Sequence, residues 1–113
     1  MTITYEDFEK IDIRVGKIIE VSDFPEAKKP AFKLKIDFGP DIGIKQSSVQ
    51  AVGAHTQNEL EGMLVCCVVN FPVKNIGPFK SEVLTLGFKN TDGAGWVLIT
   101  PAKSTIRLGD KLT

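Results

Sequence analysis

The fold is decided between Gly62 and Gly87, where the chain reads GMLVCCVVNFPVKNIGPFKSEVLTLG. Met63–Val69 is an apolar run rich in valine, and it is far shorter than a membrane span. Such a run predicts a strand that is buried on both faces. A loop with two prolines follows, and Ser81–Gly87 then alternates between polar and apolar residues, which predicts a second strand. These two strands should form a wall of the core.

The loop between the two strands holds the densest polar group of the chain. Its polar members are amides, lysines, a hydroxyl and a carboxylate: Asn70, Lys74, Asn75, Lys80, Ser81 and Glu82. Three apolar residues lie among them, namely Phe71, Ile76 and Phe79. Small β domains usually carry their binding residues on loops that a rigid scaffold holds in place. We therefore predict that this loop is the functional centre.

Length and composition indicate one globular domain over residues 1–113. The chain is 42% hydrophobic and 25% charged, and a chain of 113 residues can bury a core without a metal or a disulfide. No apolar run approaches the ~20 residues of a membrane span. The first ten residues, MTITYEDFEK, are acidic and lack the apolar region of a signal peptide. We expect a cytoplasmic protein.

The cysteines and the histidine do not suggest a metal centre or a catalytic site. Cys66 and Cys67 are adjacent on a predicted strand and point to opposite faces, so we expect two small core residues, with no disulfide and no shared metal. His55 has no familiar zinc spacing to them and no recognisable nucleophile as partner. Since a Gly-rich phosphate loop is also absent from the sequence, we expect no metal, no cofactor and no enzymatic activity.

Two short helical segments are predicted by their caps. Thr4 precedes a helix over Tyr5–Lys10, and Thr56–Leu60 has the pattern of a capping box at one helical turn. The first helix is too short to be stable in water by itself. Tyr5 and Phe8 should therefore pack on the core or on a second subunit.

The other strands follow from alternation. Phe32–Phe38 alternates most regularly, and Ile11–Val21 alternates with a phase slip at Gly16, which predicts a bulge or bend there. Ile42–Val52 continues the sheet, and its polar residues are poor core material, so some should face a groove. A helical turn between the third and fourth strands is typical of the five-stranded oligonucleotide/oligosaccharide-binding (OB) barrel.

The C-terminal part adds further strands to this minimal barrel. Asp92-Gly93 lies between Val83–Phe88 and Trp96–Thr100 and predicts a hairpin. A last short strand is expected within Ile106–Leu112. These additions and the N-terminal helix are suitable material for a dimer interface, although an extension of the core explains them equally well.

Charge leaves two interpretations of the central strands open. The formal net charge is zero, with 14 basic and 14 acidic residues, whereas a nucleic-acid-binding domain is usually basic. The lysines nevertheless gather in the central region. Lys33 and Lys35 either form a solvated face that discourages aggregation or form a basic face that meets phosphate.

Several segments resemble a known family. Asp12–Ile18, Lys33–Gly39 and the loop with Asn70, Lys74 and Ser81 resemble the tRNA-binding domain that is fused to some aminoacyl-tRNA synthetases and also occurs as small free-standing proteins. The resemblance covers about Phe8 to Leu86. It implies an all-β, five-stranded OB-fold barrel with a short N-terminal helix and C-terminal added strands, whose terminal segments form a homodimer.

The resemblance also implies two functions. Phe79–Leu84 is most similar to free-standing members that act as export-related chaperones, which implies binding of unfolded or preprotein polypeptide in cooperation with the secretion motor ATPase. The wider family implies tRNA binding. Its tRNA-binding members usually have Ser-x-Gly-Met where this chain has Ser81-Glu82-Val83-Leu84, so only Ser81 carries over.

The same residues serve both hypotheses. In a polypeptide groove, apolar contacts hold varied side chains while amides and hydroxyls pair with the backbone. In a tRNA site, lysines neutralise phosphates and polar loop residues contact a base or a 2′-hydroxyl. The ligand-binding residues that we predict are Arg14, Lys17, Lys33, Lys35, Lys45, Ser47, Asn70, Phe71, Lys74, Phe79, Lys80, Ser81 and Glu82.

Overall fold

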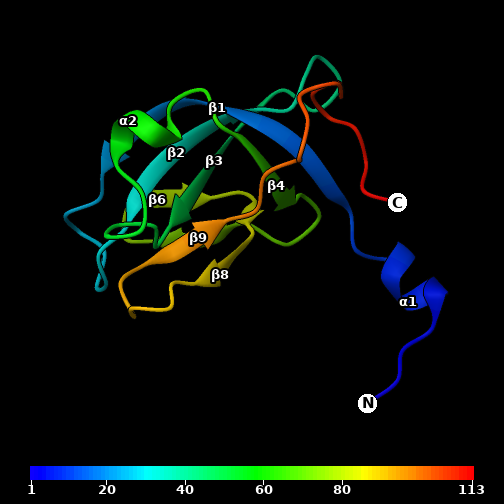
Figure 1. Ribbon diagram of the computed structural model, residues 1–113, viewed down its shortest axis with the longest axis horizontal. Coiled ribbons are helices and arrows are strands. Elements are labelled where there is room, and N and C mark those ends of the chain that lie inside the picture. The colour runs from blue at the N-terminus through cyan, green and yellow to red at the C-terminus, as the bar shows by residue number, and fades with distance from the viewer.

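The structure, a computed structural model, describes all residues from 1 to 113 and consists mainly of strands (Figure 1). The elements are α1 (Tyr5–Glu9), β1 (Ile13–Asp23), β2 (Phe32–Asp37), β3 (Ile44–Val49), α2 (Gln57–Leu60), β4 (Leu64–Val68), β5 (Lys74–Ile76), β6 (Phe79–Ser81), β7 (Leu84–Thr85), β8 (Gly87–Lys89) and β9 (Trp96–Leu98). Five strands form one antiparallel sheet in the order β3-β2-β1-β4-β7, and β5-β6 and β8-β9 are separate pairs. No helix is both long enough and apolar enough to cross a membrane.

The sheet curls into a nearly closed barrel because β1 pairs with β4 along its first half and with β2 along its second half. The free edges, β3 and the segment before β7, then meet. Glu82 donates its backbone N–H to the Gln46 carbonyl at 2.8 Å, and its carboxylate accepts the Gln46 N–H at 3.0 Å. Ser81 Oγ accepts the N–H of Ser48 at 3.1 Å. These bonds close the gap, and the predicted OB-like fold is confirmed.

The core fills the barrel in the way that alternation predicted. The inward side chains of β2 are almost fully buried, whereas Lys33 and Lys35 between them point outward. Val65 and Cys67 of β4 pack against them at 0% exposure, while Cys66 on the other face of that strand is only partly buried. Burial on both faces of this strand is therefore less complete than predicted.

The bulge in β1 lies further along the strand than the sequence suggested. The register with β2 shifts between Ile18 and Glu20, not at Gly16. Gly16 is needed for a different reason, because a Cβ there would lie 2.5 Å from Ile36 Cγ2 and 2.8 Å from the Phe38 ring. The glycine allows β2 to pack directly against the β1 backbone.

The segment predicted as a loop between the apolar strands is mostly a hairpin. Lys74–Ile76 pairs with Phe79–Ser81, and the two-residue turn has Gly77 at φ 58°. A positive φ at the first central position followed by proline, whose ring fixes a negative φ, is the pattern of a type II′ turn. The second strand expected over Ser81–Gly87 is divided between β6, β7 and β8 because its pairing partners change.

Both short helices are confirmed with their capping boxes, from Thr4 to Asp7 and from Thr56 to Glu59. Helix α1 lies apart from the barrel (Figure 1) and has no buried residue. Its Tyr5 ring contacts Phe8 at a centroid distance of 6.0 Å and remains 67% exposed. Within one chain, this helix therefore covers none of the core.

The C-terminal region differs from the prediction at its end. The β8-β9 hairpin forms around the Asp92-Gly93 loop. No strand forms within Ile106–Leu112, where the only ladder contact is a bridge between Arg14 and Lys111. The tail instead follows β1 through bonds from Gly109 N–H to the Val15 carbonyl and from Leu112 N–H to the Ile13 carbonyl, each 2.8 Å. It occupies the edge of β1 that β2 leaves free.

Candidate binding surfaces

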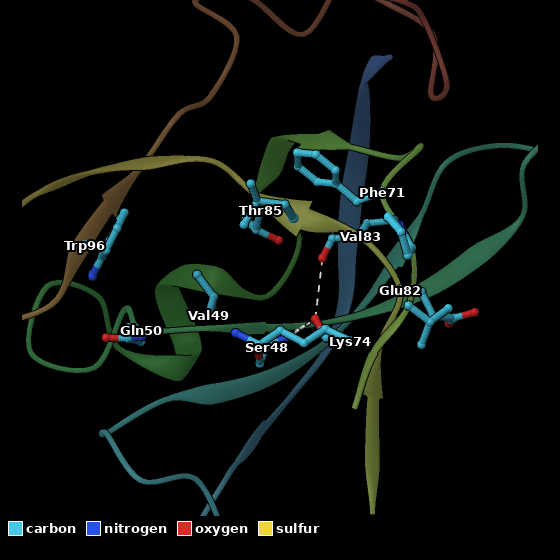
Figure 2. Close-up of a pocket in the computed structure, with 13 residues that line it drawn as sticks. Ser48, Val49, Gln50, Phe71, Lys74, Glu82, Val83, Thr85 and Trp96 are labelled. Atoms are coloured by element: carbon cyan, nitrogen blue, oxygen red, sulfur yellow. Dashed lines mark hydrogen bonds between the residues drawn. The ribbon is translucent and has the colours of Figure 1, made fainter. Parts of the chain in front are cut away.

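A hollow of about 570 Å³ opens beside the gap between β3 and β7. Its walls come from residues 48–50, 71–74 and 81–85, with Trp96 of β9 on one side and Phe71 and Glu82 on another (Figure 2). We call it the apolar groove, because four large side chains in it are exposed to solvent. These are Phe71 (54%), Val73 (50%), Leu84 (47%) and Trp96 (37%).

Thr85, which lines the apolar groove, belongs to a small network of buried polar side chains. Thr85 Oγ1 lies 2.8 Å from Ser47 Oγ and 3.5 Å from Cys67 Sγ. Burial raises the pKa of Cys67 to about 12, so the thiol stays protonated at neutral pH and is not an available nucleophile. Ser47 is fully buried and was predicted as a ligand-binding residue. Its hydroxyl is directed into this network and away from any ligand.

Four of the predicted residues line the apolar groove, namely Phe71, Lys74, Ser81 and Glu82. Ser81 and Glu82 use their side chains to hold β3, as described above, so they build the wall. Phe71 and Lys74 make no side-chain hydrogen bond or ion pair in the structure and are exposed. Of the four, these two are free to contact a ligand.

Two other predicted residues hold the terminal segments in place. Asn70 accepts the N–H of Asp12 at 3.0 Å and donates to the Lys10 carbonyl at 2.8 Å. Arg14 bonds the Asp12 carboxylate at 2.6 Å and the Gly109 carbonyl at 3.0 Å. The bond to Asp12 raises the pKa of Arg14 further. Both side chains are engaged within the chain and lie outside the groove.

A second surface, which we call the basic face, is formed by Lys33, Lys35, Gln46 and Phe79 around a smaller hollow of about 170 Å³. Its charges already have partners. The Nζ of Lys33 lies 5.6 Å from the ring centroid of Phe24, and the Nζ of Lys35 lies 3.3 Å from a Glu20 carboxylate oxygen. The Phe79 ring packs edge-on against Phe24 at 5.2 Å.

The remaining predicted lysines do not complete one basic surface. Lys45 lies opposite Ile36, whose side chain is buried, so it belongs to the inner side of β3 and not to the side of Lys33. Lys17 is exposed on β1 opposite Asp37, and Lys80 is exposed on β6 opposite Asn75. The structure therefore spreads these charges over several surfaces.

Sequence analysis missed most of the groove lining. Val73, Leu84 and Trp96 were not predicted as ligand-binding residues, and neither were Val49 and Gln50. Each is an ordinary apolar or polar residue at or next to a strand end. Trp96 comes to Val49 and Gln50 because its N–H donates to the Gln50 carbonyl at 2.8 Å, and Val73 and Leu84 come to them because Ser81 and Glu82 bond to β3. No motif in the sequence signals this meeting.

Comparison with known proteins identifies related chains. Residues 13–111 match the family described as "Putative tRNA binding domain". A crystal structure of the CsaA chaperone protein from Picrophilus torridus superposes with a TM-score of 0.90 at 53% identity, covering 99% of this chain and 100% of that one. The chaperone CsaA from Bacillus anthracis superposes with a TM-score of 0.90 at 38% identity and full coverage of both chains. These are the chaperones that the segment Phe79–Leu84 indicated.

Methionine–tRNA ligases are also similar to this chain, but over only part of their length. The enzyme from Pyrococcus horikoshii is 33% identical over 110 residues, which is 97% of this chain and 14% of the ligase. The enzyme from Porphyromonas gingivalis is 33% identical over 102 residues, again 14% of the ligase. The shared part is the tRNA-binding domain region and not a catalytic domain.

Proposed function

Because the chain belongs to the tRNA-binding domain family and superposes on CsaA chaperones over its whole length, we propose that it is a non-enzymatic, export-related chaperone that binds unfolded or preprotein polypeptide in the apolar groove. The observation that carries this proposal is the exposure of Phe71, Val73 and Leu84 in one hollow, where Ser81, Glu82 and Thr85 already have hydrogen-bond partners within the chain.

The groove suits weak and varied apolar ligands. Complete burial of one large apolar side chain is worth about 1.5–3 kcal/mol. Two or three such contacts, reduced by the entropy lost on association, give modest affinity and rapid exchange. A protein that holds a chain before passing it on needs this kind of binding. The free Lys74 at the rim adds a cation that can meet a carboxylate or a carbonyl of the bound chain.

The proposal includes a homodimer formed by the terminal segments. Helix α1 has no buried residue, and Ile3 and Tyr5 are more than half exposed. Leu112 at the other terminus is 49% exposed, and the tail lies beside the start of β1. A second copy would bury these side chains. A cytoplasmic location and the secretion motor ATPase as partner belong to the same proposal and rest on the resemblance to the chaperones.

Binding of tRNA is the alternative, and the basic face is the observation that favours it. Phe79 could stack on an unpaired base while Lys33 and Lys35 contact phosphates. The family description and the ligases that share the domain support this function. The net charge of zero and the carboxylate of Glu20 beside Lys35 count against strong binding of a polyanion.

The proposal is tested by changing one groove residue and a matched residue elsewhere. Phe71→Ser should lower the affinity for a permanently unfolded polypeptide, such as a reduced and carboxymethylated protein, by about tenfold. Phe88→Ser is the control, because Phe88 is also exposed, at 69%, but does not line the groove. Equal loss in both variants, or no loss in the first, would show that the groove is not the polypeptide site.

A further inference from the structure

The β5-β6 hairpin has one occupied edge and one empty edge. On the β6 side, the Lys80 carbonyl accepts from Gln46 Nε2 at 3.5 Å, and the Glu82 N–H donates to the Gln46 carbonyl. On the β5 side, no other strand is paired. The hairpin is therefore held to the barrel by β6 and presents β5 outward.

The backbone groups that β5 leaves free can be identified from its register. In an antiparallel pair, residues alternate between hydrogen-bonded and non-hydrogen-bonded positions. Because Lys80 directs its carbonyl to β3, its opposite residue Asn75 occupies a non-hydrogen-bonded position and directs its own N–H and C=O away from β6. Val73, two residues earlier, has the same orientation, and no hydrogen bond to its backbone is present.

The prolines of this segment do not block the free edge. A proline at Val73 or Asn75 would remove an outward donor and protect the edge, as many natural edge strands do. The segment instead has its prolines at Pro72, which precedes β5, and at Pro78 in the turn, so neither occupies an outward position. The backbone N–H groups of Val73 and Asn75 are therefore both available to an added strand.

The free edge is continuous with the apolar groove. Val73 belongs to both, since its side chain lines the groove at 50% exposure and its backbone belongs to the edge. Phe71, two residues earlier in the chain, also lines the groove, so side chains of an added strand that lie over Val73 and Phe71 would enter it. The edge is short, and it suits a brief extended stretch and not a long strand.

We propose that the polypeptide bound in the apolar groove adds a short antiparallel or parallel strand to the β5 edge, pairing its backbone with Val73 and Asn75 while its alternate apolar side chains contact Phe71 and Val73. This inference rests on the proposed function, because its occupant is the polypeptide of the groove. Backbone pairing explains how one site accepts varied sequences, since every residue except proline offers the same N–H and C=O groups.

The direct test compares two changes at one position. Asn75→Pro removes the outward N–H without removing a bond of the hairpin, and Asn75→Ala removes the side chain while it keeps the N–H. The probe is a labelled peptide of ten alternating leucine and threonine residues with a lysine at each end, followed by fluorescence anisotropy. Loss of one backbone bond should weaken binding roughly fivefold in the proline variant and less than about twofold in the alanine variant.

A second measurement keeps the test decisive if Asn75→Pro disturbs the hairpin. In the unchanged protein, exchange of the Val73 and Asn75 amide hydrogens should slow when the peptide is added. Unchanged exchange at both amides would overturn the edge pairing. Edge pairing would also be overturned if Asn75→Pro bound the peptide normally while Phe71→Ser did not. Binding in the apolar groove would then be supported without any strand addition.

Two further outcomes separate this inference from the proposed function. If the unchanged protein binds neither the peptide nor an unfolded polypeptide, the proposed function fails and the edge pairing fails with it. If Asn75→Pro alters the particle mass in sedimentation, the edge is an interface between two copies of the chain, which overturns the assignment of the edge to a polypeptide.

Discussion

The apolar groove and the basic face meet at β6, where Ser81 lines the first and Phe79 lines the second. They differ in how far the chain itself already satisfies their side chains. Lys35 of the basic face is paired with Glu20, and Lys33 lies over an aromatic ring. Phe71 and Val73 of the groove contact solvent over about half their surface, as the values of 54% and 50% show.

This difference indicates which surface gains more from a ligand. A phosphate at the basic face would have to replace the Glu20 carboxylate as the partner of Lys35. Because exposed ion pairs contribute only about 0–1 kcal/mol each, exchanging one for another gains little. An apolar side chain in the groove removes water from two apolar surfaces at once, without disrupting an existing contact. The polypeptide binding that we propose would therefore use the more favourable surface, and the following predictions test the contrast.

The largest effect is expected where both surfaces share their scaffold. Gly16→Val places side-chain atoms where a Cβ alone would lie 2.5 Å from Ile36 Cγ2, so stability should fall by about 3 kcal/mol. Binding at the groove and at the basic face should decrease together under conditions where the destabilised variant unfolds. Urea unfolding gives the loss, and Lys17→Ala at the next, exposed position is the control that should stay within about 0.5 kcal/mol.

A charge placed in the groove should separate the two surfaces. Val73→Asp puts a carboxylate among apolar side chains and should weaken binding of an unfolded polypeptide about tenfold, or roughly 1.4 kcal/mol. Binding of tRNA should change little. Val97→Asp is the matched control, because Val97 is 41% exposed and does not line the groove. A polypeptide affinity that survives Val73→Asp would argue against the groove.

The reverse separation should follow from loss of the basic face. Lys33→Ala combined with Lys35→Ala should lower the affinity for tRNA several-fold. The slope of log affinity against log salt concentration should become shallower by about one for each lysine removed, as expected for one lost phosphate contact per lysine. Polypeptide binding should stay within about twofold. Lys103→Ala with Lys111→Ala removes the same charge away from both surfaces. If this second pair had the same effect on tRNA, binding would reflect total charge and not the basic face.

The smallest effect is expected at α1, which lines neither surface. The backbone N–H of Thr4, followed by the Lys10 side chain, lowers the pKa of Asp7 below its ordinary value of 3.8. A carboxyl whose folded pKa is depressed stabilises the helix above its unfolded pKa, and this stabilisation disappears as the pH falls through the folded value. An NMR titration of the Asp7 carboxyl carbon should show a midpoint below 3.8, and Asp7→Asn should leave both binding activities unchanged. A midpoint above that value would show that the capping box does not form.

The sequence predicted those parts of the molecule whose signals are local. The alternation of Phe32–Phe38 determines which side chains enter the core, and Thr4 and Thr56 determine where the helices begin. The barrel followed because the order of these elements resembles a known family. Short strands carry no such signal, and the three residues of β5 and of β6 did not distinguish a hairpin from a loop.

The candidate site was less predictable because side-chain chemistry does not reveal which polar groups the fold has already used. Asn70 and Glu82 have typical ligand-binding chemistry, yet each bonds a backbone group that the fold would otherwise leave unpaired. Ser47 looked too polar for a core and is bonded there to Thr85. The groove is formed by Leu84 and Trp96 from elements distant in sequence, and only the folded chain brings them together.

The most direct test of the central claim is to measure binding of an unfolded polypeptide and of bulk tRNA to one sample, each at low and at near-physiological salt. An apolar groove predicts polypeptide binding that changes little with salt, because no phosphate contacts are involved. If only tRNA binds, and its affinity falls steeply as salt rises, the basic face is the functional surface and the chaperone proposal is contradicted.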